Sequence, residues 1–353
     1  MPETLDDFEG LLDWPQLQAW LAGQDLPGSG PVSAVERLAG GSQNNVFLLT
    51  RGDAKLVLRR PPEHPRSNSD KTMLREARVL AALAGSEVPH PRFYGVCDDT
   101  GVIGVCFYLM EPVLGFTPMG ALPGRYAEDP SWRRALGLSL VDAIAELAKV
   151  DPLAVGLEGF GKPEKWIERQ VARWKSQLDS YSEMEGYGKP ELPGVERVAG
   201  YLDDQRPDDF RLGIIHGDFQ HANVMAHHDR PGVAAIIDWE LSTLGDPRLD
   251  LAWLLTAFVE EGDPPGRQPY YSPADGFPSR QELIDHYAER TGLEIRDIHW
   301  WFTLACYKLG ILLEGTHARA CAGAAPKHYG DSLHKHAMWL FTKANQLADQ
   351  AGD

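Results

Sequence analysis

The chain has 353 residues, of which 43% are hydrophobic and 24% are charged, so it can form a sizeable core in one or two domains. Its 34 Lys and Arg residues against 51 Asp and Glu give a net charge of −17, which argues against nucleic-acid binding and against the anionic face of a membrane. No apolar run approaches the about 20 residues of a membrane span, and the acidic N-terminus lacks a secretory signal, so we expect a cytoplasmic protein. None of its four cysteines form a C-x-x-C pair, so we predict neither a disulfide framework nor a structural zinc site.

Residues 30–111 are predicted to form a small, mainly β domain that follows an N-terminal helical extension, residues 1–29. Asp13 is expected to cap a short helix over 13–22 in that extension. Residues 30–95 of this domain carry ten basic and six acidic residues, although the protein as a whole is acidic. Its order is β-β-β-α-β-β: strands at 32–38, 46–51, 55–60, 91–97 and 102–111, and a helix at 69–84.

Residues 112–353 are predicted to form a larger, mainly helical domain with 24 basic and 36 acidic residues. Ser279 and Glu282 form a capping-box pattern at the start of one helix, after a long Pro- and Gly-rich loop over 261–278. Further helical patterns cover 130–150, 163–183, 194–202 and the chain from Trp300 almost to its end. The fold class is therefore α+β, with two lobes that meet near residues 111–115.

The strongest functional signal lies in residues 211–255. The apolar run LGII ends in His-Gly-Asp, with Asp218 as its carboxylate, and Asn223 follows five positions later. A second apolar run, VAAII, ends at Asp238. Two strands that each deliver an acid, with an amide between them, provide a proton acceptor and oxygen ligands for Mg²⁺. This is the arrangement used for phosphoryl transfer in kinases, whereas His-Gly-Asp alone would be a weak motif.

HGDFQHANVM and IIDWE resemble the catalytic and metal loops of the aminoglycoside phosphotransferase and choline kinase-like family, which has the bilobal protein-kinase-like fold. The resemblance extends over nearly the whole chain from about residue 30. It implies ATP and Mg²⁺ as cofactors, Asp218 as the catalytic base, and Asn223 and Asp238 as the metal ligands. It also implies that Asp250 hydrogen-bonds the backbone of the catalytic loop, although an acid at a helix N-terminus explains this residue equally well.

The resemblance assigns phosphate binding to the smaller lobe. Gly40, Gly41 and Ser42 lie between two strands, where their small side chains allow backbone N–H groups to approach phosphates. Arg59 stands where the family has a lysine, and Glu76 is its expected partner on the following helix. Arginine keeps the positive charge but differs from lysine in geometry. The alternative for Glu76 is a solvated helix carboxylate.

The segment YLMEPVLG matches the interlobe hinge of the family, where Glu111 and Val113 would contact adenine through their backbone groups. A plain interlobe linker would have the same sequence. The segments LRRPP and GDPRLDLAWLL resemble the kinase-like domains associated with acyl-CoA dehydrogenases more than the drug-resistance enzymes. This subgroup implies a hydroxyl-bearing, acyl-CoA-type metabolite as a possible substrate.

Three alternatives to a small-molecule hydroxyl kinase of the antibiotic type remain open at this point. A nucleotide-binding pseudokinase would explain Arg59, and a metal phosphohydrolase would use the histidines His216, His221, His227 and His228. A kinase for a hydroxyacyl-CoA-type metabolite is the third. Aromatic residues at 163–205 and 261–278 are candidates for the acceptor surface, although core packing is the better explanation for the two tryptophans. These candidates are Trp166, Trp174, Tyr181, Tyr270 and Tyr271.

Overall fold

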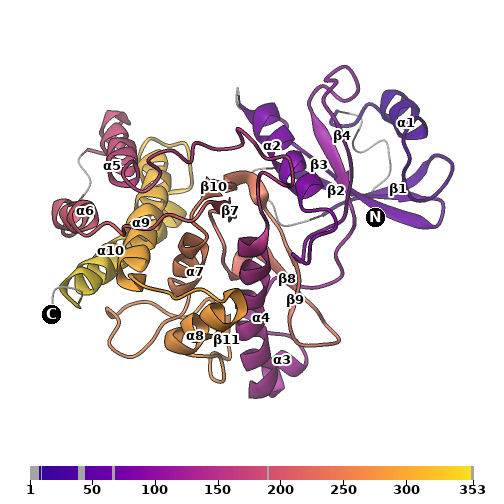
Figure 1. Ribbon diagram of the computed structural model, residues 1–353. Helices are drawn as coiled ribbons and strands as arrows, with labels where there is room; N and C mark the ends of the chain where they lie inside the picture. Colours follow the sequence, from indigo (N-terminus) through magenta and orange to yellow (C-terminus); the bar gives the residue numbers. More distant parts are fainter. Residues whose placement is uncertain (1–7, 9, 39–43, 66–67, 189–190, 351–353) are drawn as a thin grey trace.

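The computed structural model describes residues 8, 10–38, 44–65, 68–188 and 191–350 (Figure 1). The smaller lobe contains a five-stranded antiparallel sheet in the order β1-β2-β3-β5-β4. Its strands are β1 (Val32–Arg37), β2 (Asn45–Arg51), β3 (Ala54–Arg60), β4 (Phe93–Cys97) and β5 (Phe107–Met110). The expected order of strands and helix is thus present, and Gly52, at φ 59°, lies in the turn between β2 and β3.

One face of this sheet forms a separate hydrophobic core with the N-terminal helix α1 (Trp14–Ala22). Side chains of β2 alternate between buried and half-buried positions, as expected for a strand with one face on a core. Phe107 packs edge-on against Trp20 of α1, with ring centroids 5.0 Å apart. Asp13 caps α1 by accepting a hydrogen bond from the Gln16 N–H at 3.1 Å, as predicted.

The helix α2 (Ser69–Ala82) connects the two lobes through its packing. Met73, Ala77 and Leu80 belong to the large core of the helical lobe rather than to the core beneath α1. Glu76 lies on the same side of α2 and is fully buried. The helix therefore places the Glu76 carboxylate where the sheet and the helical lobe meet. Because this carboxylate is buried, Glu76 is not the solvated helix residue of the alternative interpretation.

The strand expected at 102–111 begins only at Phe107. Residues 99–104 form turns instead, with backbone hydrogen bonds from Val102 N to Asp99 O (3.2 Å) and from Gly104 N to Thr100 O (2.9 Å). The Asp99 side chain also accepts from Gly101 N at 2.8 Å, and Gly104 has a φ of 81°. Asx-type hydrogen bonding and a left-handed glycine thus override the apolar pattern of residues 102–105.

The larger lobe is mainly helical, and Figure 1 shows its C-terminal helices at the end of the molecule opposite the five-stranded sheet. This lobe also contains short two-stranded sheets. Its helices are α3 (Arg125–Glu128), α4 (Pro130–Lys149), α5 (Gln170–Ser180), α6 (Val195–Asp204), α7 (Arg248–Leu255), α8 (Arg280–Thr291), α9 (Ile298–Cys321) and α10 (Lys327–Gln350). Its strands are β6 (Gly120–Ala121), β7 (Gly213–Ile215), β8 (Val224–Ala226), β9 (Val233–Ile236), β10 (Thr243–Gly245) and β11 (Tyr271–Ser272).

Two helical predictions need correction. The helix expected at 163–183 begins at Gln170, because turns fill the preceding segment and Lys165 has a φ of 49°. The helix expected from Trp300 onward is two antiparallel helices, α9 and α10, separated at 322–326. Gly323, at φ 74°, and Pro326 end the first and start the second. The capping box of Ser279 and Glu282 starts α8 as predicted.

Within the described residues, no helix combines the length and the apolar character needed to cross a bilayer. The division into an extension (1–29), a smaller lobe (30–111) and a larger lobe (112–353) stays a prediction.

Candidate active site

The His-Gly-Asp segment follows β7 directly and is held by a buried carboxylate from α7. Asp250 accepts hydrogen bonds from the backbone N–H groups of His216 (2.6 Å) and Gly217 (2.9 Å). Gly217 has a φ of 85°, and a Cβ there would lie 2.5 Å from Leu241 O, so only glycine fits. The predicted contact of Asp250 with this loop is therefore present.

His216 joins the two loops that carry the candidate carboxylates. Its ring Nε2 lies 2.9 Å from the carbonyl oxygen of Ile237, the residue before Asp238. The ring is buried and packs against Trp239, with centroids 4.9 Å apart. This histidine thus orders the backbone between the two loops, while His227 and His228 lie on the β8–β9 hairpin.

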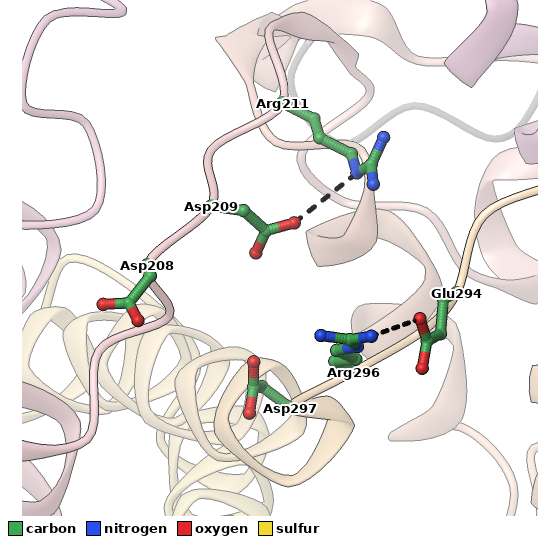
Figure 2. Close-up of a pocket in the computed structure, with 6 residues that line it drawn as sticks. All are labelled: Asp208, Asp209, Arg211, Glu294, Arg296 and Asp297. Carbon is green, nitrogen blue, oxygen red and sulfur yellow. Dashed lines mark hydrogen bonds and ion pairs between the residues drawn. The ribbon is translucent and has the colours of Figure 1, made fainter.

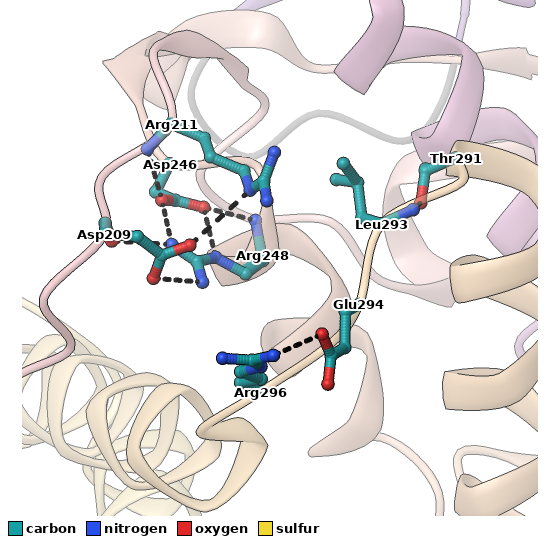
Figure 3. A network of polar contacts seen from close by, with 8 residues as sticks. All are labelled: Asp209, Arg211, Asp246, Arg248, Thr291, Leu293, Glu294 and Arg296. Carbon is teal, nitrogen blue, oxygen red and sulfur yellow. Dashed lines mark hydrogen bonds and ion pairs between the residues drawn. The ribbon is translucent and has the colours of Figure 1, made fainter.

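A charged cavity of about 390 Å³ lies between the segment that precedes β7 and the segment that precedes α9. Its lining consists of acidic residues and arginines (Figure 2). Figure 3 shows the ion-pair network beside it, in which Asp246 accepts from the Arg211 backbone N–H (2.9 Å) and pairs with Arg248 (2.7 Å). Asp246 and Arg248 are almost fully buried. The network thus joins the segment before β7 to the start of α7; Asp218 follows β7, and α7 carries Asp250. The cavity is lined by Asp208, Asp209, Arg211, Glu294, Arg296 and Asp297.

Asp218 and Asn223 lie in direct contact. The Asn223 Nδ2 group donates to Asp218 Oδ2 and to the Asp218 backbone oxygen, both at 2.8 Å. Asp218 Oδ1 accepts from Gln220 Nε2 (2.9 Å) and from Trp253 Nε1 (3.0 Å). Burial raises the pKa of the Asp218 carboxyl, and the hydrogen bond from Asn223 acts against this rise. The carboxylate is thus fixed in orientation.

Lys308 is a functional candidate that the sequence reasoning missed. Its Nζ donates to the Gly217 carbonyl oxygen at 2.9 Å and lies 4.5 Å from the ring centroid of Trp253. Burial lowers the pKa of Lys308 to about 8, while the charges of Asp250 and Asp218 act in the opposite direction. A signal was available, because Lys308 is the single Lys or Arg between Arg296 and Arg319, in a mainly apolar stretch.

Arg59 bridges the two lobes. Its Nε lies 3.0 Å from Glu76 Oε2, and its Nη2 lies 2.6 Å from Asp238 Oδ1. Tyr108 donates a further hydrogen bond to Glu76 Oε2 at 3.0 Å. Burial alone would lower the pKa of Arg59, but the surrounding anionic groups raise it above its ordinary value. The predicted pairing of Arg59 with Glu76 is present, and Arg59 also contacts Asp238.

Glu240 is the second residue that the sequence reasoning missed. One carboxylate oxygen from each of Glu76, Asp238 and Glu240 lies within 4.8 Å of the others. Burial and the charge of Asp238 raise the pKa of Glu240 to about 7. Asp238 itself has a left-handed backbone, with φ 65°, which turns the chain immediately after β9. The Asp-Trp-Glu spacing, two residues apart across one turn, was the signal in the sequence.

A cavity of about 720 Å³ lies between the sheet and the loops that carry Asn223 and Asp238. Glu111 and Val113 line it, and the Glu111 N–H donates to Arg92 O at 2.8 Å. Gly40, Gly41 and Ser42 fall outside the described residues. The cavity is lined by Leu38, Asn44, Val46, Val57, Arg59, Leu80, Pro91, Tyr108, Met110, Glu111, Val113, Thr117, Ala222, Asn223, Met225, Ile237, Asp238 and Trp239.

The aromatic candidates for an acceptor surface are mostly core residues. Trp166, Trp174, Tyr181 and Tyr271 are all buried, and Tyr270 is half-buried. Trp166 stacks on Trp301 of α9, with centroids 6.2 Å apart. Core packing thus explains the two tryptophans, as expected.

The fold and site together define a kinase-like phosphotransferase, and the chain belongs to the phosphotransferase enzyme family, whose model matches residues 34–283. Human acyl-CoA dehydrogenase family member 11 is 32% identical over 323 residues, which are 88% of this chain, and the chain spans 40% of that relative's length. A crystal structure from Ralstonia eutropha JMP134, described as a candidate aminoglycoside phosphotransferase, is 28% identical, with a TM-score of 0.79 and coverage of 95% of this chain and 99% of the other. The GDP complex of wild-type aminoglycoside 2'-phosphotransferase-IIIa has a TM-score of 0.60 at 16% identity, with coverage of 89% and 94%. These findings confirm the family resemblance and the bilobal α+β fold.

Proposed function

We propose that the protein transfers the γ-phosphoryl group of ATP to a hydroxyl of a small molecule. The observation that carries this proposal is the cavity in which Arg59, Asn223 and Asp238 meet, with Asp218 hydrogen-bonded to Asn223. A cation, two oxygen donors and a fixed carboxylate at one end of a cleft are the parts that phosphoryl transfer needs. No nucleic-acid or membrane partner is part of the proposal.

The nucleotide would lie in this cavity with its adenine at the hinge. Because the Glu111 N–H is engaged with Arg92 O, Glu111 would bind adenine through its carbonyl oxygen, and Val113 would contribute its backbone N–H. Arg59 would bind the phosphates, and Gly40, Gly41 and Ser42 would cover them. The pairing of Arg59 with Glu76 supports catalysis over a pseudokinase, since it keeps the cation beside Asp238.

The residues present fit a magnesium ion. Both Asn223 hydrogen bonds use its Nδ2, so its side-chain oxygen is the group that would bind the ion. Asp238 uses Oδ1 for Arg59, and Glu240 adds a carboxylate close by. Oxygen donors of this kind suit Mg²⁺, which would neutralise charge on the phosphate oxygens when bound.

Asp218 would position the acceptor hydroxyl and accept its proton. Its hydrogen bonds from Gln220 and Trp253 fix the carboxylate before substrate arrives, so little reorganisation is needed. Lys308 would act one step further away, by holding the Gly217 carbonyl and keeping positive charge near Asp218. Lys308 is thus a positioning residue.

For the acceptor, we favour a hydroxyl-bearing acyl-CoA-type metabolite over an aminoglycoside. The support is the 32% identity to acyl-CoA dehydrogenase family member 11 over 88% of the chain. The test is ATP consumption against a panel of hydroxyacyl thioesters, other hydroxylated metabolites and aminoglycosides, with Asp218→Asn as the control. Consumption that requires one acceptor and is lost in Asp218→Asn supports the proposal. Nucleotide binding without consumption on the whole panel favours a pseudokinase, and acceptor hydrolysis without ATP that depends on zinc favours a phosphohydrolase.

A further inference from the structure

A second cluster of ligand-type side chains lies between α9 and α10, outside the site described above. Glu314 and His317 are three residues apart on α9, and Asp331 and His334 are three residues apart on α10. Side chains at i and i+3 share a helix face, so each helix presents a carboxylate and an imidazole together. Figure 1 shows α9 and α10 beside each other at the end of the molecule away from the sheet.

The two pairs face each other at short distances. His334 Nδ1 lies 2.8 Å from Glu314 Oε2, and His317 Nδ1 lies 3.6 Å from Asp331 Oδ1. One ligand atom from each of Glu314, His317 and His334 lies within 4.8 Å of the others. The two imidazole rings stack with centroids 4.6 Å apart and an interplanar angle of 27°. Small side-chain shifts would bring these atoms to the roughly 2 Å bonds of a tetrahedral metal ion.

The arrangement leaves one nitrogen without the hydrogen bond that its burial demands. His317 Nδ1 is buried and has no hydrogen-bond partner in the part of the chain that the structure describes. Its nearest ionic neighbour, Asp331, is too distant for a good hydrogen bond at 3.6 Å. A cation at this position would bind the unpartnered His317 nitrogen together with His334 and Glu314, whereas Asp331 is already paired with Lys327 at 3.0 Å.

Neighbouring side chains contact the atoms of Glu314 and His317 that face away from the cluster. Tyr187 donates a hydrogen bond of 2.6 Å to Glu314 Oε1, the oxygen that does not contact His334. Cys321 Sγ lies 3.7 Å from His317 Nε2, the ring nitrogen opposite Nδ1. Such outer contacts orient metal ligands in proteins. The Glu314 side chain is 1% exposed and that of His334 is 29% exposed, so the cluster is enclosed but open to solvent on one side.

We propose that Glu314, His317, Asp331 and His334 form a binding site for a divalent transition-metal ion of the zinc class, which joins α9 to α10. Two imidazoles with two carboxylates suit zinc, whereas magnesium prefers oxygen ligands alone. Three of these ligands already lie within reach of one another, and Asp331, now paired with Lys327, would turn to His317 to complete a closed structural site. The absence of C-x-x-C pairs does not bear on it, because its ligands are histidines and carboxylates.

The test is titration of the chelator-treated full chain with Zn²⁺ in excess Mg²⁺, followed by isothermal calorimetry, and with Co²⁺, followed by visible absorption. We expect one ion per chain, the intense visible bands of tetrahedral Co²⁺, and a rise in melting temperature with Zn²⁺. His334→Ala, whose ring is partly exposed, should weaken Zn²⁺ binding by about 100-fold or more. Asp331→Asn should weaken it less.

The matched control is His328→Ala, an exposed histidine on the same helix α10 that should bind Zn²⁺ as the wild type does. Circular dichroism of each metal-free variant confirms that it is folded. Equal Zn²⁺ affinity in His334→Ala and the wild type would overturn the proposal, as would the absence of Zn²⁺ binding in the presence of Mg²⁺.

Discussion

Removal of the Arg59 guanidinium should destabilise the fold, because it leaves a buried carboxylate without its cation. Glu76 is fully buried, and its contacts are Arg59 at 3.0 Å and the Tyr108 hydroxyl at 3.0 Å. Loss of one partner of a buried ion pair costs about 3–5 kcal/mol. We therefore expect Arg59→Met to lower the free energy of unfolding by about 3–5 kcal/mol at about pH 8, as measured by urea denaturation without Mg²⁺.

The loss should depend on pH with a defined sign. Burial raises the pKa of Glu76, and Arg59 acts against this rise, so Arg59→Met raises the pKa further. A carboxyl whose pKa is higher in the folded than in the unfolded chain destabilises the fold increasingly as pH rises from the unfolded towards the folded pKa. The loss of unfolding free energy caused by Arg59→Met should thus be smaller at about pH 5 than at about pH 8.

The control is the double variant Arg59→Met/Glu76→Gln, which removes both charges and should recover most of the lost stability at about pH 8. Two results would refute this reasoning: Arg59→Met unfolds at the same urea concentration as the wild type, or the double variant is as unstable as the single one. Either would mean that Arg59 does not compensate the buried charge of Glu76.

Three further changes test how the site is held. Asp250→Asn should reduce turnover and lower the free energy of unfolding by roughly 3 kcal/mol, because the amide NH₂ replaces one of the two oxygens that accept from the His216 and Gly217 N–H groups. Wild-type thermal stability in Asp250→Asn would show that the loop does not need both hydrogen bonds. Gly217→Ala should abolish turnover, since its φ is 85° and a Cβ would lie 2.5 Å from Leu241 O; a crystal structure with an unshifted loop and normal kinetics would speak against it. Ser279→Ala removes the cap of α8 and should cost about 1 kcal/mol in chemical denaturation without affecting turnover, so a kinetic defect there would be unexpected.

Much of the fold could be predicted because local patterns and local structure agree. The β-β-β-α-β-β order, the Asp13 cap and the Ser279 capping box all follow from periodicity and capping chemistry. The prediction was wrong where backbone conformation outweighed periodicity, as in the turns before Phe107 and at Lys165. Periodicity of hydrophobic residues cannot detect a left-handed backbone, so it extended those elements too far.

The candidate site divides in the same way. Asp218, Asn223 and Asp238 could be found from their spacing along the chain, since Asp218 and Asp238 each follow a short strand and Asn223 lies directly before β8. Lys308 stood out in the sequence as a lone basic residue, but its contact could not be predicted, because Lys308 is 91 residues from Gly217 and only tertiary packing brings them together. Glu240 was overlooked beside Asp238, since nothing in the sequence shows that the turn after β9 brings both carboxylates near Glu76. The contacts of Arg59 likewise depend on the packing of α2.

The measurement that tests the central claim most directly is the turnover of Asp218→Asn with the acceptor that the wild type phosphorylates. Asparagine keeps the size of the side chain but cannot accept a proton, so we expect turnover to fall by roughly 10²–10⁴-fold. ATP affinity, measured by calorimetry with Mg²⁺, should stay close to that of the wild type, because Asp218 is not among the residues that line the cavity. Wild-type turnover in Asp218→Asn would contradict the claim that this carboxylate accepts the proton of the acceptor.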